Sequence, residues 1–452
     1  MKKISVIGLG FVGLPTFLIL SNIKKNNKYI YEVEGIEKHN SNGLLIKKNF
    51  ENNHNWINSS DKNFNKFFEK AAKRKEIKIK TNLDSISESK IIIVSINFDF
   101  NSESKNHFKN LKMISSNIAK KINKKTLVIF ETTLPPGTTD NVIIPIFKET
   151  LKKRKIKIKD IFFCYSFERV MPGENYINSI VSNYRCYSGI NKESKMMCKK
   201  FLQTFIHYKK YRLTELDKII ECETAKVLEN SYRASNIALI DEWTKASEVL
   251  NINLNKVIES IKLRNTHSNI MWPGLGVGGY CLTKDPSFIK FSVSKYYKKK
   301  ISFPFISSTS KINKGMVNTS VNLIKKKVKN LKKKNVLICG VSYKENTSDT
   351  RFSPSIDLIK KIKNKCAKIS VLDPYHQSEI NELKKINFVR TLNKNFDILI
   401  FCVKHKEFDK ISFNKISFSK KTKVFDLNRV LTNKQKKVLN AKKIEIYEIG
   451  VN

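Results

Sequence analysis

The stretch KISVIGLGFVG, residues 3–13, decides the fold of the first part of this 452-residue chain. Its apolar first half has the length and composition of a buried parallel strand. Its second half spaces glycines as GxGxxG, and the apolar run from Val12 to Leu20 predicts a helix directly after it. A strand that passes through such a loop into a helix is typical of the first unit of a doubly wound parallel sheet.

The glycine loop predicts a binding site for a dinucleotide. Gly8 permits the tight turn, Gly10 lets the backbone approach a pyrophosphate, and Gly13 lets the helix pack closely on the strand. Phe11 and Val12 complete the loop, and the helix that follows offers unpaired N–H groups to the phosphates. The plainer alternative is that the three glycines serve close packing alone.

Glu37 ends the second predicted strand, YIYEVEGIE, and stands 24 residues after Gly13 (37 − 13 = 24). In dinucleotide-binding sheets, a carboxylate at about this spacing binds the ribose hydroxyls. Because such a carboxylate also repels the 2′-phosphate of NADP, the sequence predicts NAD as the cofactor. The alternative for this residue is a surface carboxylate without a ligand.

The middle of the chain differs in character from the part before it. Up to about residue 165, strand-length apolar runs alternate with helical stretches such as 107–122. These runs lie at 91–96, 126–130 and 161–165. From about 217 to 260, apolar residues recur at intervals of three and four, which predicts a long helical segment.

A second alternation of strands and helices begins beyond the Lys-rich stretch at 325–334. It predicts strands in NVLICGVSY, AKISVLDPY, FDILIFCV and TKVFDLN, and helices at 354–364 and near 378–385. The expected fold is therefore α/β, with two Rossmann-like doubly wound parallel-sheet domains joined by a central all-helical domain. The expected domains are 1–210, 211–325 and 326–452.

The run GLGVGGYCLTKD, residues 274–285, has the composition of a reactive site. Dense glycines let backbone amides crowd against a ligand, and Cys281 has Lys284 and Asp285 nearby, which suits a thiolate nucleophile. Packing in the core is the usual role of a single cysteine and remains the alternative. The eight cysteines form no CxxC pair and no zinc-like spacing, which predicts reduced thiols in the cytoplasm and no metal site.

The charge balance of the chain raises the question of a polyanionic partner. There are 86 Lys+Arg and 40 Asp+Glu, giving a net charge of +46. The lysines are spread along the chain and no nucleic-acid module is recognisable, so we expect a solvated surface and no nucleic-acid partner. The start MKK with the apolar run after it imitates a signal peptide, but its glycines and short length argue against export and against a membrane anchor.

Six sequence blocks, in order, carry a resemblance that covers nearly the whole chain. They are GLGFVG (8–13), TTLPPGTT (132–139), FERVMPG (167–173), ETAKVLENSYRASNIAL (223–239), GVGGYCLTKD (276–285) and SYKENTSDTRFSPS (342–355). With these blocks the chain resembles the UDP-glucose/GDP-mannose dehydrogenase family. The TTLPPGTT block follows a predicted strand, where open α/β sheets bind ligands, although by itself it could be only a helix cap.

The resemblance implies a catalytic set. The family's catalytic cysteine falls on Cys281, and its lysine and asparagine fall on Lys226 and Asn230, one helical turn apart, which suits a site that binds an oxyanion. Asp285 matches the acidic residue that helps to handle protons or a water. Glu168 matches the glutamate of the family's water and cofactor site.

Further positions implied by the resemblance hold the ligands. Thr132 and Thr133 match positions at the water and cofactor site. Gly278 and Gly279 match the loop that touches the substrate. Two more residues, Lys344 and Arg351, match positions that reach the nucleotide sugar and the cofactor, respectively.

The function that the resemblance implies is a four-electron oxidation of a UDP-sugar at C6 by NAD. It proceeds through a Cys281 thiohemiacetal and thioester and supplies an activated uronic acid for surface polysaccharide. ERVMPG resembles the branch acting on UDP-N-acetylhexosamines, whereas GGYC resembles the UDP-glucose branch, so both substrates stay open. A two-electron hydroxyacid dehydrogenase and a basic nucleic-acid-binding protein are the competing hypotheses. We also expect a homo-oligomer, at least a dimer, formed through 217–260.

Overall fold

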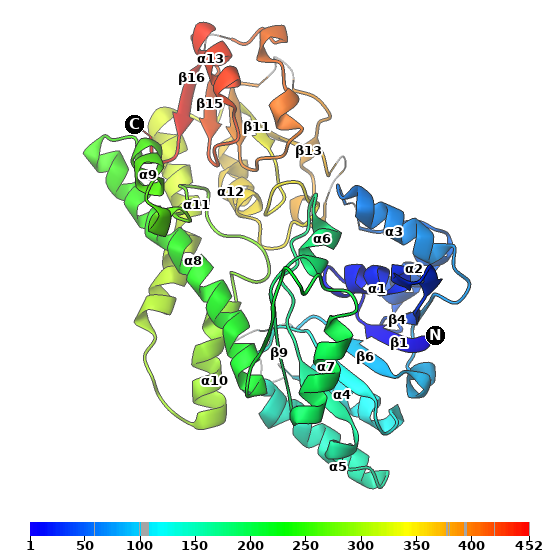
Figure 1. Ribbon diagram of the computed structural model, residues 1–452. Coiled ribbons are helices and arrows are strands. Elements are labelled where there is room, and N and C mark those ends of the chain that lie inside the picture. The colour runs from blue at the N-terminus through cyan, green and yellow to red at the C-terminus, as the bar shows by residue number, and fades with distance from the viewer. Residues whose placement is uncertain are drawn as a thin grey trace. The chain divides into compact units, whose positions relative to one another are not determined.

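The computed structural model describes residues 1–57, 59–98, 100, 108–376, 378, 380–392, 396–419 and 421–451. They fall into two compact units, which Figure 1 shows in ribbon form. Unit 1 comprises residues 1–229 and 287–302, and unit 2 comprises 230–286 and 303–452. The division into domains at 210 and 325 stays a prediction.

Unit 1 is built on one sheet, in which the described residues form eight strands in the order β10-β9-β8-β7-β6-β1-β4-β5. All neighbours are parallel except the antiparallel pair β8 and β9. The strands are β1 Lys2–Ile7, β4 Tyr31–Ile36, β5 Lys78–Lys80, β6 Ile91–Val94, β7 Leu127–Phe130, β8 Phe162–Tyr165, β9 Arg185–Gly189 and β10 Leu213–Glu215. A small hairpin, β2 Lys24–Lys25 and β3 Lys28–Tyr29, stands apart from the sheet.

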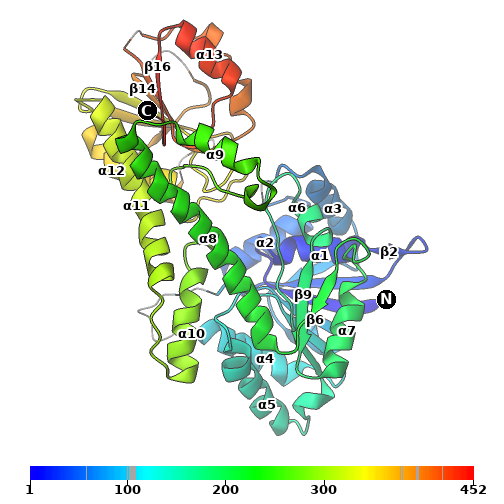
Figure 2. The ribbon, with the colours of Figure 1, turned by 60° about the vertical axis from the view of Figure 1, so that its left-hand side comes forward.

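Helices cover both faces of this sheet, as a parallel sheet requires. They are α1 Gly13–Asn22, α2 Ser41–Glu51, α3 Lys62–Ala72, α4 Lys109–Lys121, α5 Ile144–Lys153, α6 Tyr176–Val181, α7 Lys192–Leu202 and α10 Phe288–Tyr297. Short turns of helix are η1 Asp84–Glu88, η2 Thr139–Ile143 and η3 Ile158–Asp160. In Figure 2, α4 and α5 lie on one side of the strands and α7 lies on the other.

Alternation along the central strands divides the core of unit 1 into two layers. Ile91 and Ile93 of β6 belong to the cluster that includes α1, α3 and α7, whereas Ile92 and Val94 belong to the cluster that includes α4 and α5. Successive side chains along a strand point to opposite faces of the sheet. Both faces of the strand are therefore buried, which explains its continuous apolar sequence.

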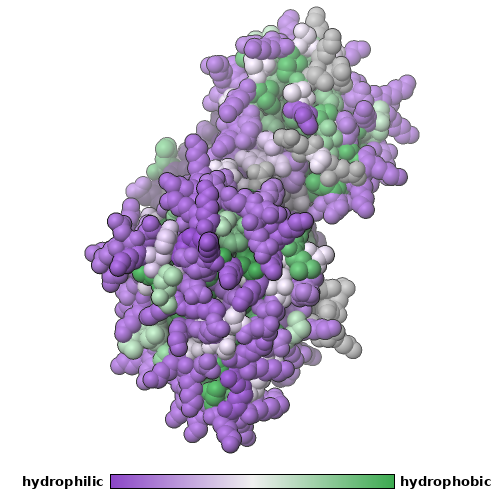
Figure 3. Space-filling view, turned by 90° about the vertical axis from the view of Figure 1, so that its right-hand side faces the viewer, coloured by the Kyte–Doolittle hydropathy of each residue, from purple (hydrophilic) through white to green (hydrophobic). Residues whose placement is uncertain are grey.

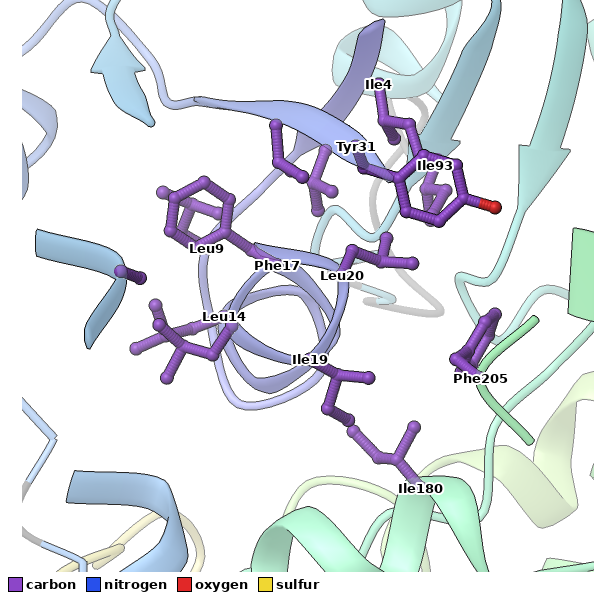
Figure 4. Packing of buried hydrophobic residues seen from close by; sticks show 14 of the residues in the cluster. Ile4, Leu9, Leu14, Phe17, Ile19, Leu20, Tyr31, Ile93, Ile180 and Phe205 are labelled. Atoms are coloured by element: carbon purple, nitrogen blue, oxygen red, sulfur yellow. The ribbon is translucent and has the colours of Figure 1, made fainter. Parts of the chain in front are cut away.

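Helix α1 is enclosed by the rest of unit 1, since every residue from Gly13 to Ser21 is buried. Figure 4 shows Leu20 pointing toward the sheet residues Tyr31 and Ile93, while Ile19 points toward Ile180 of α6. A helix that is apolar on all sides is typical of a core element. The packing therefore fixes the position of its N-terminus at the glycine loop.

Unit 2 holds a second parallel sheet, with six strands among its described residues in the order β13-β12-β11-β14-β15-β16. The strands are β11 Asn335–Cys339, β12 Lys368–Leu372, β13 Asn387–Phe388, β14 Ile398–Phe401, β15 Lys423–Asp426 and β16 Glu445–Glu448. Strands β12 and β13 lie on one side of β11, and β14, β15 and β16 lie on the other. Strands β5-β4-β1-β6-β7-β8 of unit 1 follow the same order.

The remaining helices lie around and before the second sheet. They are α9 Leu254–Lys262, α11 Pro304–Lys327, α12 Pro354–Ile362 and α13 Asn433–Ala441, with the short turns η4 Asn265–His267, η5 Asp285–Ser287, η6 Lys363–Lys365, η7 Asn381–Leu383, η8 Phe408–Lys410 and η9 Phe413–Lys415. Helix α8, Ile219–Leu250, begins in unit 1 and ends in unit 2. Between β10 and β11, a stretch described without gaps, the chain forms only helices and loops. The predicted α/β class with two Rossmann-like sheets and a helical middle is confirmed.

Two helix predictions need correction. The segment 217–260 forms two helices, α8 and α9, because Asn251 adopts a left-handed conformation (φ 54°) that ends α8. The described residues of 378–385 form only the short turn η7. There Ile380, Leu383 and Ile386 pack on the core of unit 2 at intervals of three, which imitates helical periodicity in a loop.

The surface agrees with the interpretation of the lysines as solvated. Hydrophilic residues predominate on the face that Figure 3 shows, and apolar residues are scattered among them. Such scattered apolar residues are normal on a protein surface. Within the described residues, no helix combines the length and the apolar character needed to cross a membrane.

Candidate active site

The glycine loop of unit 1 leaves open space for a ligand at only one of its three glycines. A Cβ at Gly8 (φ 88°) would lie 2.7 Å from the carbonyl oxygen of Ser95, and one at Gly13 would lie 1.8 Å from that of Gly8. By contrast, nothing lies within 4 Å of a Cβ built on Gly10. Two glycines thus serve close packing, and Gly10 leaves the backbone accessible.

Two further features of the loop favour an anion. No side chain caps the N-terminus of α1, which begins at Gly13, and its first turn holds no acidic residue. Its N–H groups and dipole therefore point their positive end at the loop.

Glu37 lies just past β4, half-buried, and accepts a hydrogen bond from the N–H of Leu9. The carboxylate is thereby held beside the loop.

A buried ion pair lies under the loop. Glu131, at the end of β7, pairs with Arg185 of β9, and both side chains are almost fully buried. The hydroxyl of Ser95 donates to Glu131 Oε2 at 2.9 Å. Burial raises the pKa of Glu131, whereas the positive charge of Arg185 acts to lower it. Because the carbonyl of Ser95 packs against Gly8, this pair supports the floor of the loop.

The two threonines after β7 differ in their surroundings. Thr132 is buried, its hydroxyl donates to the carbonyl of Ile96 at 2.9 Å, and its carbonyl accepts from the hydroxyl of Tyr165. Thr133 is half-buried. Thr132 therefore ties β7 to the end of β6, and only Thr133 exposes part of its side chain.

Glu223 of α8 holds the turn that follows these threonines. Its carboxylate accepts from the N–H of Gly137 at 2.5 Å, and from the N–H and hydroxyl of Thr139 at 2.9 and 2.7 Å. Burial raises the pKa of Glu223 to about 8. Sequence reasoning missed the role of Glu223, because Glu221 and Glu229 lie near it in the same helix and nothing in the sequence distinguishes the three acids.

Lys226 and Glu168 meet in the interior of unit 1. Lys226 Nζ donates to the carbonyl oxygen of Glu168 at 2.8 Å and lies 3.7 Å from its Oε1. The ammonium also lies 5.4 Å from the centre of the Phe167 ring. Both charged side chains are buried, so each compensates the cost of burying the other. The structure thus brings these two sequence-predicted residues together.

In unit 2, the loop carrying Cys281 lies tightly against the segment that follows β11. The N–H of Gly279 (φ 82°) donates to the carbonyl of Arg351 at 3.1 Å. A Cβ on Gly278 would lie 2.8 Å from the carbonyl oxygen of Phe352. Only glycine permits this approach. All eight cysteines are described, and Cys281 alone is classed as exposed.

Asp285 organises the other end of this loop. It is fully buried; its Oδ2 accepts from Asn230 Nδ2 at 2.7 Å, and its Oδ1 accepts from Lys284 Nζ at 2.8 Å. Its N–H donates to the carbonyl of Cys281 at 2.9 Å. A buried carboxylate is stable here because each oxygen has a donor. The structure therefore brings Asn230 into contact with Asp285, whose backbone is bonded to that of Cys281.

Lys344 and Arg351 lie on the segment after β11. The guanidinium of Arg351 binds Asp349 through a fork of contacts at 2.6 to 3.1 Å. Burial lowers the pKa of Lys344, and the nearby Arg233 acts in the same direction. Sequence reasoning missed Asp349 and Arg233, because a charged residue shows no partner in the sequence. The sequence did hold a signal that Arg185 is buried, because this arginine stands between apolar residues in a strand-like stretch.

Comparisons with known proteins identify the family of the chain. Three domain profiles of one family match: its NAD binding domain at residues 2–206, its central domain at 221–315 and its UDP binding domain at 337–433. A UDP-N-acetyl-D-mannosamine dehydrogenase of Methanocaldococcus jannaschii is 31% identical, over 96% of this chain and 95% of that protein. The chain belongs to the UDP-glucose/GDP-mannose dehydrogenase family.

Two further comparisons concern other members of the family. A UDP-N-acetyl-D-glucosamine 6-dehydrogenase of Salmonella typhi is 26% identical over 96% of this chain and 98% of that protein. The structure of a UDP-D-ManNAc dehydrogenase from Pyrococcus horikoshii superimposes with a TM-score of 0.80 at 22% identity, covering 99% of each chain. The likeness to the Pyrococcus horikoshii structure shows a shared fold.

As a member of this family, the protein is an NAD-dependent nucleotide-sugar dehydrogenase. The glycine loop fits NAD, since the backbone at Gly10 is open, the N-terminus of α1 has no side-chain cap, and Glu37 stands at the position of a ribose ligand. The roles of the individual site residues stay predictions.

Replacing Glu37 by Gln should weaken the preference for NAD over NADP. The amide oxygen can still accept from the N–H of Leu9, but the charge that repels a 2′-phosphate is gone. We expect the ratio of kcat/KM for NAD to that for NADP to fall at least about tenfold, the equivalent of ~1.4 kcal/mol. Glu32→Gln on β4 is the control, and an unchanged ratio in Glu37→Gln would contradict the assignment.

Glu223 should make stability depend on pH. Its folded pKa of about 8 lies above an unfolded value of about 4.3, so between these pH values the folded state holds a proton that the unfolded state has lost. Stability should fall by about 2 kcal/mol from pH 6 to pH 8 on this account, and level off above pH 8. Urea unfolding of Glu223→Gln should lack this decrease, whereas the exposed Glu221→Gln should keep it. An identical pH dependence in the wild type and Glu223→Gln would refute the prediction.

Proposed function

We propose that this protein oxidises the C6 alcohol of a UDP-N-acetylhexosamine to a carboxylate. The observation that carries the proposal is the exposure of Cys281 on a glycine loop beside Asp285 and Asn230, while the other seven cysteines are buried or partly buried. The names of the two relatives, both UDP-N-acetylhexosamine dehydrogenases, support the substrate class. The sequence ERVMPG supports it too, whereas GGYC alone would favour UDP-glucose.

Cys281 serves as the nucleophile between two oxidations. NAD, when bound, accepts the hydride that leaves C6 in each of them. Cys281 Sγ adds to the C6 aldehyde, and the thiol proton ends on the aldehyde oxygen, giving a thiohemiacetal. Loss of a hydride from C6 and a proton from that hydroxyl leaves a thioester. Water then attacks the carbonyl, the C–S bond breaks, and the thiol is restored. In sum, one alcohol and one water give one carboxylate, two hydrides and three protons.

Other residues of the chain stabilise charge and hold the substrate. Lys226 and Asn230, four residues apart on α8, are proposed to bind the oxyanions of the tetrahedral stages. Asp285 fixes the amide of Asn230 and receives protons. Glu168 and Thr133 are proposed to position the water and the cofactor. The product would be an activated uronic acid for surface polysaccharide.

Ligand binding is proposed for the glycine loop that carries Cys281 and for the segment after β11. Gly278 and Gly279 are proposed to place the backbone of the loop beside the sugar, because their lack of side chains lets the loop pack closely on the segment after β11. Lys344 is proposed to bind the nucleotide sugar through its charge, and Arg351 to reach the cofactor. Covalent capture by Cys281 makes the second oxidation intramolecular and retains a reactive aldehyde.

Replacing Cys281 by Ser should reduce turnover by orders of magnitude while ligand binding survives. The change is nearly isosteric, but a serine alkoxide forms less readily and its ester is a poorer acyl intermediate. Steady-state NADH formation measures turnover, calorimetry measures binding, and mass spectrometry detects any slowly hydrolysed adduct. Cys366→Ser, at a partly buried thiol in unit 2, is the control. Near-normal turnover in Cys281→Ser would overturn the mechanism.

The substrate class can be tested by NADH formed per sugar across a panel. The panel holds UDP-glucose, three UDP-N-acetylhexosamines (gluco, galacto and manno) and GDP-mannose. We expect two NADH per sugar and the highest kcat/KM with a UDP-N-acetylhexosamine. One NADH per substrate would favour a two-electron dehydrogenase, and UDP-glucose as the best substrate would overturn the assigned class.

The exposed face of α8 supports a dimer. Tyr232, Leu239, Trp243 and Leu250 recur at intervals of seven, four and seven along the helix, and each is more than half exposed. These intervals place the four side chains on one stripe of the helix. We propose that a second copy of the chain covers this stripe, because a continuous apolar stripe is unfavourable in water.

Trp243→Glu should convert such a dimer to a monomer. A charge in the middle of the stripe would be buried without a partner, which costs several kcal/mol in an interface. Light scattering at micromolar concentration gives the mass. Met113→Glu, an exposed apolar position on α4, should leave the mass unchanged. A monomer mass for the wild-type protein would contradict the proposed dimer.

A further inference from the structure

The second sheet repeats the arrangement of the glycine loop. Gly340, directly after β11, adopts a φ of 93°, as Gly8 does after β1. Asp373, directly after β12, accepts from the N–H of Val341 at 2.7 Å. Glu37, directly after β4, accepts from the N–H of Leu9 in the same way. Asp373 thus occupies in unit 2 the place that Glu37 occupies in unit 1.

The two carboxylates differ in their surroundings. Glu37 is half-buried, whereas Asp373 is only 3% exposed. Asp373 Oδ1 accepts from the N–H of Tyr375 at 2.8 Å, and its Oδ2 lies 3.4 Å from Nε2 of His405, which is fully buried. Protein groups thus surround the carboxylate of Asp373. It lies where a ribose ligand would be expected, but it is not accessible to one.

His405 in turn holds the segment after β11. Its Nδ1 accepts from the N–H of Asn346 at 3.0 Å, and Asn346 Oδ1 accepts from the N–H of Lys406 at 3.0 Å. A backbone N–H can only donate, so Nδ1 carries no proton and the proton of the neutral ring is on Nε2, facing Asp373. The left-handed conformation of Asn346 (φ 55°) is held from both sides by these bonds.

Asn346 lies two residues after Lys344, on the segment that runs from Val341 to Arg351. We propose that His405, oriented by Asp373, is a positioning residue that holds this segment so that Lys344 meets the diphosphate of the nucleotide sugar. The contact to the diphosphate rests on the function proposed above. The carboxylate that would bind a ribose in a dinucleotide site serves here to orient a histidine. Loss of the acceptor for this part-buried N–H would remove one of the two bonds that hold the conformation of Asn346.

Two substitutions at His405 separate its two contacts. His405→Asn places an amide oxygen near Nδ1 and can still accept from the N–H of Asn346. His405→Gln places its amide near Nε2, so it can still reach Asp373 but leaves that N–H without an acceptor. Both remove the ring from the same buried site, so a loss of stability is common to both.

The dissociation constant of UDP, measured by calorimetry, and the KM of the nucleotide sugar are the readouts. We expect about tenfold weaker UDP binding in His405→Gln, because one part-buried hydrogen bond is lost, and binding within about threefold of wild type in His405→Asn. The KM for NAD should be unchanged in both variants. Equal UDP binding in the two variants, or weakening only in His405→Asn, would overturn the proposal.

A third variant covers the case in which both fail to fold. Asn346→Gly tolerates the left-handed conformation and keeps its N–H, but loses the bond to Lys406 and becomes more flexible. It should also bind UDP more weakly, and wild-type affinity would contradict the positioning role. A wild-type protein that oxidises no UDP-sugar would refute the proposed function, while UDP binding by the variants would still decide the role of His405.

Discussion

The close contact between α1 and the end of β1 is the constraint on which unit 1 depends. A Cβ on Gly13 would lie 1.8 Å from the carbonyl oxygen of Gly8, so only hydrogen fits between helix and strand. This contact aims the N-terminus of α1 at the loop and leaves Gly10 open to a ligand. The buried pair of Glu131 and Arg185 supports the same loop through Ser95. The shape of the glycine loop thus arises from backbone packing.

Three of the charged residues that the sequence points to, Lys226, Glu168 and Asp285, are buried. Lys226 lies with Glu168 in unit 1, and Asp285 lies with Asn230 and Lys284 in unit 2. Removing a charge from water is costly unless a partner compensates it, so each of these buried charges lies beside a partner. The contacts within each pair fix the geometry of the side chains.

The two sheets show how one arrangement serves two uses. Six neighbouring strands of the first sheet follow the strand order of the second, and both sheets have a left-handed glycine after the first strand. In unit 1 the carboxylate after the second strand stays half exposed, while in unit 2 it is enclosed and faces His405. The difference between them lies in a few polar contacts at the carboxyl ends of the strands, where open α/β sheets bind ligands.

The sequence by itself determined the α/β class with two parallel sheets and a helical middle, the glycine loop after β1 and the loop that carries Cys281. These features depend on apolar periodicity and on glycine, which act over a few residues. It misplaced a helix near 378–385, because a loop whose apolar residues pack at intervals of three has the same pattern as a helix. Only the tertiary structure decided that Cys281 is exposed, that Arg185 pairs with Glu131, and that His405 holds Asn346. The two pairs join residues 54 and 59 positions apart, and no local pattern encodes which distant charge or amide a buried side chain will meet.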